Sequence, residues 1–334
     1  MKEFSIRIAA FVLLQATIFL TFAWDSTLSH ETGYLAATID KHRRLDQSVP
    51  PRIILIGSSS FAFGIRSDRL EKELGRPVIN MGLDSSLGID FILEEVKPAI
   101  RRGDCAVLSV EASMFSGGIF PMRQRQILEY RPASLAFVSP ETLRNILNEH
   151  LFALPGSWAR RSIGLSFAKL PPTRAETTYS RVGFNAWGDY VAHYDATNNM
   201  AAGAATVPGS PSQSDPGWGH ARPVGKGLHE RIEAFARLCS KRGALFVFTC
   251  PPQPSEYYER HFVMTRSAMD FLRSVPDLLV LDAPEDHLYD LSLFYDTYHH
   301  LTRDGADLRT TKLIHELRRI LPHDSGEPDS KRNR

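Results

Sequence analysis

Short apolar runs alternate with amphipathic stretches along most of the chain. The runs lie at 52–57, 77–82, 105–111, 244–252 and 277–284, and the stretches at 67–75, 85–103, 139–152, 227–243 and 305–321. Runs that are apolar throughout are typical of parallel strands covered on both faces. The alternation therefore predicts an α/β fold, in which helices flank a doubly wound parallel sheet of the flavodoxin-like kind.

Residues at the ends of these stretches support the helix assignments. Gly75 follows 67–75 as a C-cap, and Ser139 precedes Pro140 as an N-cap. In 305–321 the spacing of the apolar residues predicts one inward face. That face comprises Leu308, Leu313, Ile314, Leu317 and Ile320.

The N-terminus carries Lys2 and Arg7, followed by an uncharged run from Ile8 to Trp24. This run is just long enough to cross a bilayer, and the basic residues before it place the N-terminus in the cytoplasm. We expect residues 1–24 to form a transmembrane anchor; a cleaved signal peptide and a buried helix are the alternatives. The chain would then be a single-pass protein of the inner or plasma membrane, with its domain in the periplasm.

The rest of the chain divides into four expected parts. Residues 25–50 form a spacer or short helix, 51–322 the α/β domain, and 323–334 a disordered tail. An irregular insertion occupies about 171–227, and its part from Pro208 to Pro223 is expected to be poorly ordered. The aromatic stretch 183–195 either stacks on sugar rings or packs onto the domain.

Composition excludes several classes of protein. A formal net charge of +1 gives no reason to expect nucleic-acid binding. The 3 cysteines have no C-x-x-C spacing, which excludes a disulfide framework and a zinc ribbon. Cys105 and Cys250 lie in apolar runs and are expected to be buried.

Polar residues follow the apolar runs at the ends where parallel strands hold their ligands. Gly57 precedes three serines, Ser58 to Ser60; Asn80 and Gly82 end the second run, and Glu111 ends the third. The absence of a lysine after the serines excludes a P-loop. A reactive serine needs a histidine base, an acid that orients the histidine, and N–H donors for the oxyanion. The segment 289–305 is rich in Asp and His. A metal site there is an alternative, but no further ligands have a clear spacing. His193, His220 and His229 are expected to face solvent.

Three blocks together resemble the SGNH (GDSL-type) hydrolases, in the G-S-S variant of envelope-associated members. These blocks are "IGSSSFAFGI" at 56–65, "VINMG" at 78–82 and "YDTYHHLTRDG" at 295–305. The resemblance implies that Ser59 is the nucleophile, that the Gly82 amide joins the Ser59 amide in the oxyanion hole, and that no cofactor or metal is needed.

The last block leaves two histidines open. Counting back from Gly305 selects His300 as the base, whereas the D-x-x-H spacing from Asp296 selects His299. We take His300 as the base and Asp296 as the orienting acid, with His299 as the alternative base and Asp290 as a weaker acid.

The third block departs from the family pattern. Glu111 stands where an asparagine would donate to the oxyanion, and an ionised glutamate can only accept hydrogen bonds. Asn80 or another group must donate instead, or Glu111 is structural, or the chemistry is altered. The expected function is an extracytoplasmic esterase or O-acyltransferase acting on an acylated envelope glycan or exopolysaccharide. The alternative is a catalytically inactive glycan-binding or scaffold protein; protein partners are not indicated.

Overall fold

The computed structural model describes residues 3–4, 6–8, 10–15, 32–116, 121–148, 179–196 and 227–322. Its centre is a five-stranded parallel sheet in the order β2-β1-β3-β4-β6. The strands are β1 (Ile53–Gly57), β2 (Val78–Asn80), β3 (Cys105–Ser109), β4 (Leu245–Phe248) and β6 (Leu279–Val280). All five fall within the predicted apolar runs, and their order is that of flavodoxin-like sheets.

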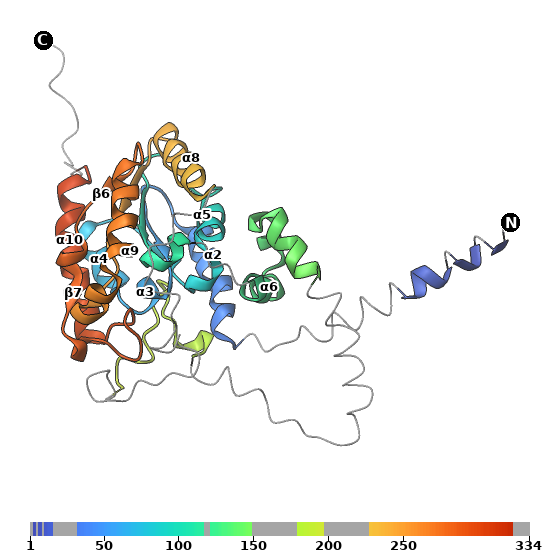
Figure 1. Ribbon diagram of the computed structural model, residues 1–334, viewed down its shortest axis with the longest axis horizontal. Coiled ribbons are helices and arrows are strands. Elements are labelled where there is room, and N and C mark those ends of the chain that lie inside the picture. Colours follow the sequence, from blue (N-terminus) through green and yellow to red (C-terminus); the bar gives the residue numbers. More distant parts are fainter. Residues whose placement is uncertain are drawn as a thin grey trace, which may run out of the picture.

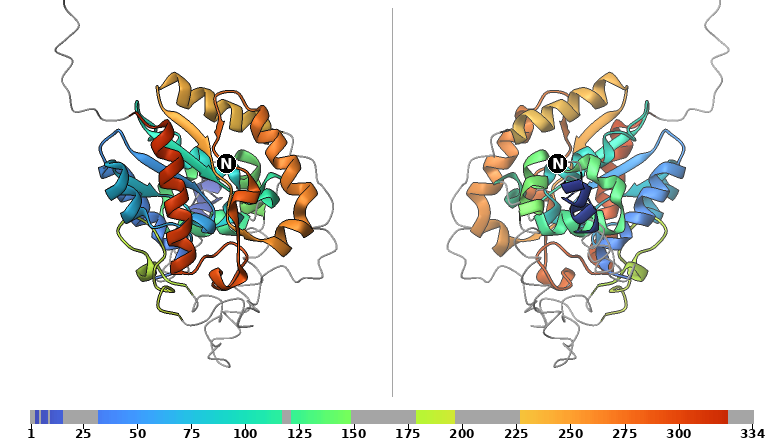
Figure 2. Two further views of the ribbon diagram at one scale, coloured as in Figure 1. Left: turned by 90° about the vertical axis from the view of Figure 1, so that its left-hand side faces the viewer. Right: turned by 90° about the vertical axis from the view of Figure 1, so that its right-hand side faces the viewer.

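Helices cover both faces of the sheet (Figures 1 and 2). Alternate residues of β1 point to opposite faces. Ile53 and Leu55 join a core with α4 (Ser67–Leu74) and α10 (Arg303–Ile320). Ile54 and Ile56 join a larger core with α5 (Ile89–Val96) and α8 (Leu228–Lys241). The predicted α/β fold with a helix-flanked parallel sheet is confirmed.

The helix ends follow the sequence signals, but one helix is shorter than predicted and the buried face of another differs from the prediction. Gly75 adopts φ 66° as C-cap of α4, and Ser139 Oγ accepts from Thr142 N–H at 3.1 Å before the helical residues 140–148. The helix predicted over 85–103 is shorter in the structure, because α5 ends at Val96. Leu308 is 50% exposed, so its inward placement was wrong: the buried face of α10 runs through Ala306, Arg309 and Leu313 instead.

Several elements had no counterpart in the predictions. The largest is α9 (Ser255–Ser274), which packs on η3 (Ala112–Ser116) and β6. The others are α6 (Pro121–Tyr130), the small parallel sheet of β5 (Gln253–Pro254) and β7 (Leu288–Tyr289), and short 3₁₀ segments. These segments are η1 (Tyr34–Ala37), η2 (Ser85–Leu87), η3 (Ala112–Ser116), η4 (Pro132–Phe137), η6 (Arg181–Gly183), η8 (Pro284–His287) and η9 (Leu291–Leu293).

The N-terminal region is described only in part. Within the described residues, no helix is both long enough and apolar enough to cross a membrane. Residues 10–15 are helical, and the rest of the expected anchor up to Trp24 lies outside the described residues. The expected spacer contains the short helix α2 (Thr38–Gln47), which packs onto the domain: Leu35, Ala37 and Leu45 belong to the larger core.

Parts of the expected insertion contribute to the folded domain. The aromatic stretch 183–195 packs inward through Phe184 and Tyr190, which favours the packing interpretation. His193 is buried, so its expected exposure was wrong, whereas His229 is exposed as predicted. The segment 208–223, His220 and the tail 323–334 lie outside the described residues. All three cysteines are free and buried, as expected for Cys105 and Cys250.

A buried lysine joins α2 to the sheet and to the aromatic stretch. Lys41 Nζ donates to the carbonyl oxygens of Asn80 at 2.8 Å and Gly188 at 2.5 Å. Burial lowers the pKa of Lys41 to about 7, although Asp189 and Glu95 act in the opposite direction. Lys41 therefore holds together the part of the fold next to the carboxyl end of β2.

This depressed pKa predicts an unusual dependence of stability on pH. Between pH 8 and 10 the unfolded chain keeps the Lys41 proton that the folded chain has lost, so stability rises with pH. Relative to Lys41→Met, the unfolding free energy of the wild type should rise by about 1.4 kcal/mol per pH unit over this range. Urea titrations of both proteins measure it.

Exposed Lys72 on α4 provides the control. Lys72→Met should follow the wild type at every pH. Parallel curves for the wild type and Lys41→Met would mean that Lys41 stays protonated in the fold, contrary to this prediction.

Candidate active site

The serine turn follows β1 at the point where the strand order reverses. The chain runs from β1 to β2 on one side and then to β3 on the other, and ligands bind at the carboxyl ends of such a pair. Ser58 caps the short helix α3 (Ser59–Ala62): its hydroxyl accepts from Ser60 N–H at 3.1 Å. Ser58 and Ser60 are fully buried, whereas Ser59 is partly exposed. Of the three serines, Ser59 alone can meet a substrate.

Its backbone position suits Ser59 for a second task. As the first residue of α3, Ser59 has an N–H without a carbonyl partner inside the helix. An N–H of this kind can receive an oxyanion formed on the Ser59 side chain. The expected role of the Ser59 N–H as an oxyanion donor is therefore compatible with the position of Ser59 in α3.

His300 and Asp296 form the expected pair. His300 Nδ1 lies 2.8 Å from Asp296 Oδ1, so Nδ1 carries the proton and Nε2 of the neutral ring is an acceptor. The His300 ring stacks on Phe63 with centroids 3.9 Å apart and planes 7° apart. Phe63 is the C-cap of α3 and its N–H donates to the Ser59 carbonyl at 2.9 Å, so the imidazole packs on the residue that ends the helix that Ser59 begins. The Asp296–His300 pair thus packs against α3, the helix that carries Ser59, through the Phe63 ring.

His299 points to a different part of the molecule. Its Nδ1 lies 2.9 Å from the carbonyl oxygen of Pro252, and its ring meets Tyr257 edge to face. Burial lowers the pKa of His299. The weaker acid candidate Asp290 is exposed and accepts from Ser292 N–H at 2.9 Å as the cap of η9. Neither residue shares the Asp296–His300 bond.

The two further oxyanion candidates are already hydrogen-bonded. Asn80 Nδ2 donates to the carbonyl of Phe61 and to Asp189, each at 2.9 Å, and Gly82 N–H donates to Asn80 Oδ1 at 3.0 Å. A Cβ on Gly82 would lie 2.7 Å from the Ser58 carbonyl oxygen, so glycine lets β2 approach the serine turn. Oxyanion roles for Asn80 and Gly82 remain predictions, and they require these bonds to open.

Glu111 lies at the end of β3, beside the serine turn. Its Oε1 accepts from the Ser58 hydroxyl at 2.5 Å, and it is 5% exposed. Because Ser58 also caps α3, this bond fixes the turn that carries Ser59. Glu111 therefore has a structural contact with the candidate site in this arrangement.

Three contributors to the site were not anticipated. The Tyr179 hydroxyl donates to Asp296 Oδ2, and its ring contacts Phe63 with centroids 5.1 Å apart. Arg309, on the buried face of α10, donates to the Ser60 carbonyl at 2.7 Å. Asp189 accepts hydrogen bonds from Ser67 N–H and from Asn80 Nδ2, and burial raises the pKa of its carboxyl group. No spacing rule joins these residues to the blocks that contain the serine and the histidine.

Tyr179 should position Asp296. Tyr179→Phe keeps the ring and removes a hydrogen bond to an ionised group, which is worth about 1.5–3 kcal/mol. We expect kcat for p-nitrophenyl acetate to fall about tenfold or more, with KM nearly unchanged. Steady-state kinetics measures both constants.

Tyr295→Phe, next to Asp296 in the chain, is the matched control and should keep kcat near the wild-type value. A Tyr179→Phe enzyme with unchanged kcat, or with its whole loss in KM, would contradict the positioning role.

In comparisons with known proteins, the chain matches no protein-family model and no curated protein.

Proposed function

We propose that this protein is a serine-dependent esterase or O-acyltransferase of the SGNH type that its sequence blocks resemble. The observation that carries the proposal is the Asp296–His300 hydrogen bond of 2.8 Å, with the His300 ring stacked on Phe63, the C-cap of the helix that Ser59 begins. A serine, a histidine with its Nε2 free to accept, and an acid behind the histidine are the groups that acyl transfer needs.

The proposed reaction has two steps. Ser59 Oγ attacks the ester carbonyl, its proton passes to His300 Nε2, and that proton then goes to the leaving alkoxide as the C–O bond breaks. Water or a second alcohol then gives its proton to His300 and attacks the acyl carbon, which releases Ser59 and returns the proton to it. Asp296 keeps Nδ1–H oriented throughout, and Ser59 N–H donates to the oxyanion in both steps.

The test is labelling with a fluorophosphonate, which reacts with activated serines. We expect stoichiometric modification of the wild type, mapped to Ser59 by peptide mass spectrometry. Ser59→Ala should not be labelled, whereas Ser60→Ala, which removes a buried hydroxyl next to it, should be. An unlabelled, folded wild type would overturn the proposal.

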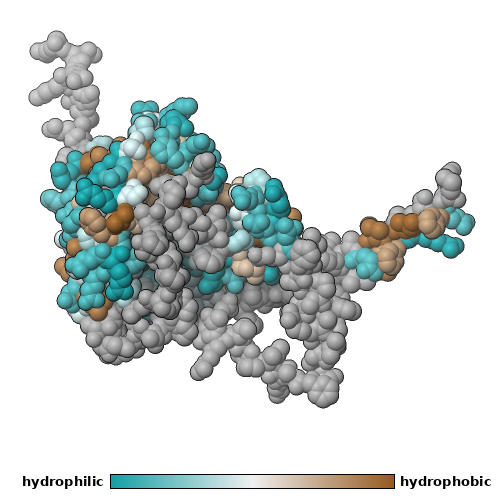
Figure 3. Space-filling model, in the orientation of Figure 1, coloured by the Kyte–Doolittle hydropathy of each residue, from teal (hydrophilic) through white to brown (hydrophobic). Residues whose placement is uncertain are grey.

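The proposed substrate is an acylated envelope glycan or exopolysaccharide. The proposed location is the membrane, with the domain on the extracytoplasmic side. Apolar side chains of the helical residues near the N-terminus are exposed (Figure 3), including Phe4, Ile8, Phe11 and Leu14. Burial of such side chains in lipid is favourable. N-terminal sequencing of the membrane fraction should recover a chain that starts near Met1; a soluble product that starts near Asp25 would refute the anchor.

The second candidate function is a glycan-binding protein without catalysis. It is favoured by Glu111 at the third block and by the existing hydrogen bonds of Asn80 and Gly82 N–H. The same labelling experiment separates the two, since a binding protein has no activated serine.

A further inference from the structure

His193 is a buried histidine that the proposed reaction does not use. It is 5% exposed, and the centre of its ring lies 5.0 Å from the centre of the Phe63 ring. The His300 ring stacks on the same phenylalanine at 3.9 Å. His193 and His300 therefore contact one ring, which belongs to the residue that ends α3.

The hydrogen bond of His193 reaches the residue that follows His300. His193 Nε2 lies 2.8 Å from the carbonyl oxygen of Leu301. A carbonyl oxygen can only accept, so Nε2 carries the proton and donates it to this bond. Burial lowers the pKa of His193 to about 4, so the ring is neutral at neutral pH. His193 is thus a neutral donor to the backbone beside His300.

The stretch that carries His193 is also bound to the helix of the candidate nucleophile. Tyr190 N–H donates to the Ala62 carbonyl of α3 at 2.7 Å, and the Tyr190 ring stacks on Phe63 with centroids 4.6 Å apart. Ser59 begins this helix. Residues 190–193 therefore connect the helix of Ser59 to the loop of His300.

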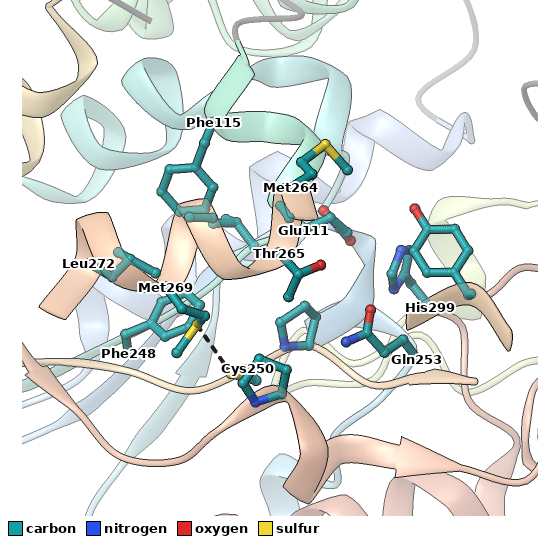
Figure 4. Close-up of a pocket in the computed structure, with 16 residues that line it drawn as sticks. Glu111, Phe115, Phe248, Cys250, Gln253, Met264, Thr265, Met269, Leu272 and His299 are labelled. Carbon is teal, nitrogen blue, oxygen red and sulfur yellow. Dashed lines mark hydrogen bonds between the residues drawn. The ribbon is translucent and has the colours of Figure 1, made fainter. Parts of the chain in front are cut away.

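The loop of His300 has a second attachment on its other side. Figure 4 shows the His299 ring among the residues that line a small pocket beneath α9, with Glu111 nearby. His299 Nδ1 lies 2.9 Å from the Pro252 carbonyl oxygen. Bonds within the loop, such as Tyr295 N–H to the His300 carbonyl at 2.8 Å, fix its shape. The bond from His193 fixes its place against α3.

The second ring nitrogen indicates why a histidine at this position needs an explanation. His193 Nδ1 is buried and has no hydrogen-bond partner among the described residues. A buried acceptor without a partner is destabilising, and phenylalanine would fill the same space without it. The Nε2–H bond to Leu301 is what phenylalanine could not supply.

We propose that His193 positions the catalytic histidine. Its Nε2–H fixes the Leu301 carbonyl, and its ring supports Phe63. The His300 ring thereby keeps both its stacking and its bond to Asp296. That His300 is a base rests on the proposed function. His193 acts through Leu301 and Phe63 and not on the reacting atoms, so it is a positioning residue.

The experiment begins with His193→Phe, which keeps a ring of similar shape and removes the donor. We expect kcat for p-nitrophenyl acetate to fall about fivefold, the factor for one neutral hydrogen bond, with KM nearly unchanged because His193 does not meet substrate. His193→Gln has an amide that can donate to the Leu301 carbonyl, so its kcat should lie closer to that of the wild type. Rates are compared at temperatures where circular dichroism shows every variant folded.

Tyr194, the next residue, gives the matched control. Its hydroxyl is buried and, in the described part of the chain, has no hydrogen-bond partner, so Tyr194→Phe should keep the wild-type kcat. Unchanged kcat in His193→Phe, or His193→Gln no better than His193→Phe, would overturn the positioning role.

The ring tautomers give a readout that needs no substrate. NMR spectra of the wild type with nitrogen-labelled histidine should show His300 protonated at Nδ1 and His193 at Nε2. In His193→Phe the His300 signals should move toward a mixture of tautomers, because its ring leaves Asp296 more often. Signals of His300 that are the same in both proteins would contradict the proposal.

The two proposals fail separately. If His193→Phe changes the His300 tautomer but fluorophosphonate does not label the wild type, His193 orients a histidine that has no catalytic part, and the proposed function falls. If the wild type is labelled and His193→Phe matches it in kcat and in tautomer, the esterase proposal stands and the positioning role falls.

Discussion

His300→Ala is expected to lower kcat/KM for p-nitrophenyl acetate by about three orders of magnitude or more, as removal of a triad base does. The reason is the tautomer of His300: with Nδ1–H held by Asp296 at 2.8 Å, Nε2 can take the Ser59 proton. Alanine leaves the serine without a base. Initial rates at several substrate concentrations give the loss.

His299→Ala is the matched variant one residue away. Because its Nδ1 faces Pro252 and its ring faces Tyr257, His299 should contribute nothing to proton transfer at Ser59. We expect its kcat to stay within about tenfold of the wild type. Circular dichroism should show both variants folded.

The reverse result would move the base to His299 and restore the D-x-x-H spacing. Equal and small losses in both variants would remove the triad and leave the binding-protein function. Either outcome contradicts the assignment made from the Asp296–His300 bond.

The segment around His300 shows why the histidine that bonds Asp296 could be selected from the sequence. Thr302 caps α10 by accepting from Gly305 N–H at 3.4 Å, and Leu301 is fully buried against the start of that helix. The start of α10 therefore fixes the positions of the residues just before it. The count back from Gly305 uses this local geometry, whereas the D-x-x-H count depends on a turn whose length varies. Local capping chemistry is readable from sequence.

The contributions of Tyr179 and Arg309 could not be read in the same way. Tyr179 is 117 positions from its partner Asp296, and Arg309 is 249 positions from Ser60. Only the folded sheet, with the aromatic stretch packed across the serine turn, brings them together. Arg309 also looks like a solvent-facing residue in the sequence, yet it occupies the inward face of α10 where Leu308 was expected.

The long helix α9 shows a second reason why part of the fold could not be predicted from the sequence. It carries Phe262 and Val263 on its exposed side and buries Thr265 on its inward side, so its apolar spacing does not mark one clean face. Conversely, the strands were readable because each is mainly apolar along its length, and Gly75 marked a helix end because only glycine adopts its φ of 66° readily.

Arg309→Met is expected to lower the free energy of unfolding by about 3–5 kcal/mol, because removal of a buried charged group leaves its partners unsatisfied. Arg309 is 1% exposed and donates to the Ser60 carbonyl at 2.7 Å and to Ser109 Oγ at 2.8 Å. Its guanidinium also lies 4.8 Å from the centre of the Phe61 ring. Methionine cannot donate to either oxygen, so both lose their partner beneath α3. Urea unfolding monitored by circular dichroism measures the loss.

Activity separates the structural part of this effect from the positioning part. Because Ser60 follows Ser59, loss of the Arg309 bond should let the serine turn move, and kcat should fall even at temperatures where Arg309→Met is fully folded. Arg309→Lys keeps the charge but presents a single ammonium in place of the planar fork, so it should restore part of the stability and less of kcat.

Arg319, on the same helix with a side chain 67% exposed, gives the control: Arg319→Met should change both quantities little. An Arg309→Met protein as stable and active as the wild type would mean that the serine turn is held by Ser58 and Glu111 alone. In that case Glu111→Gln, which weakens the bond to Ser58, should produce the larger loss of kcat.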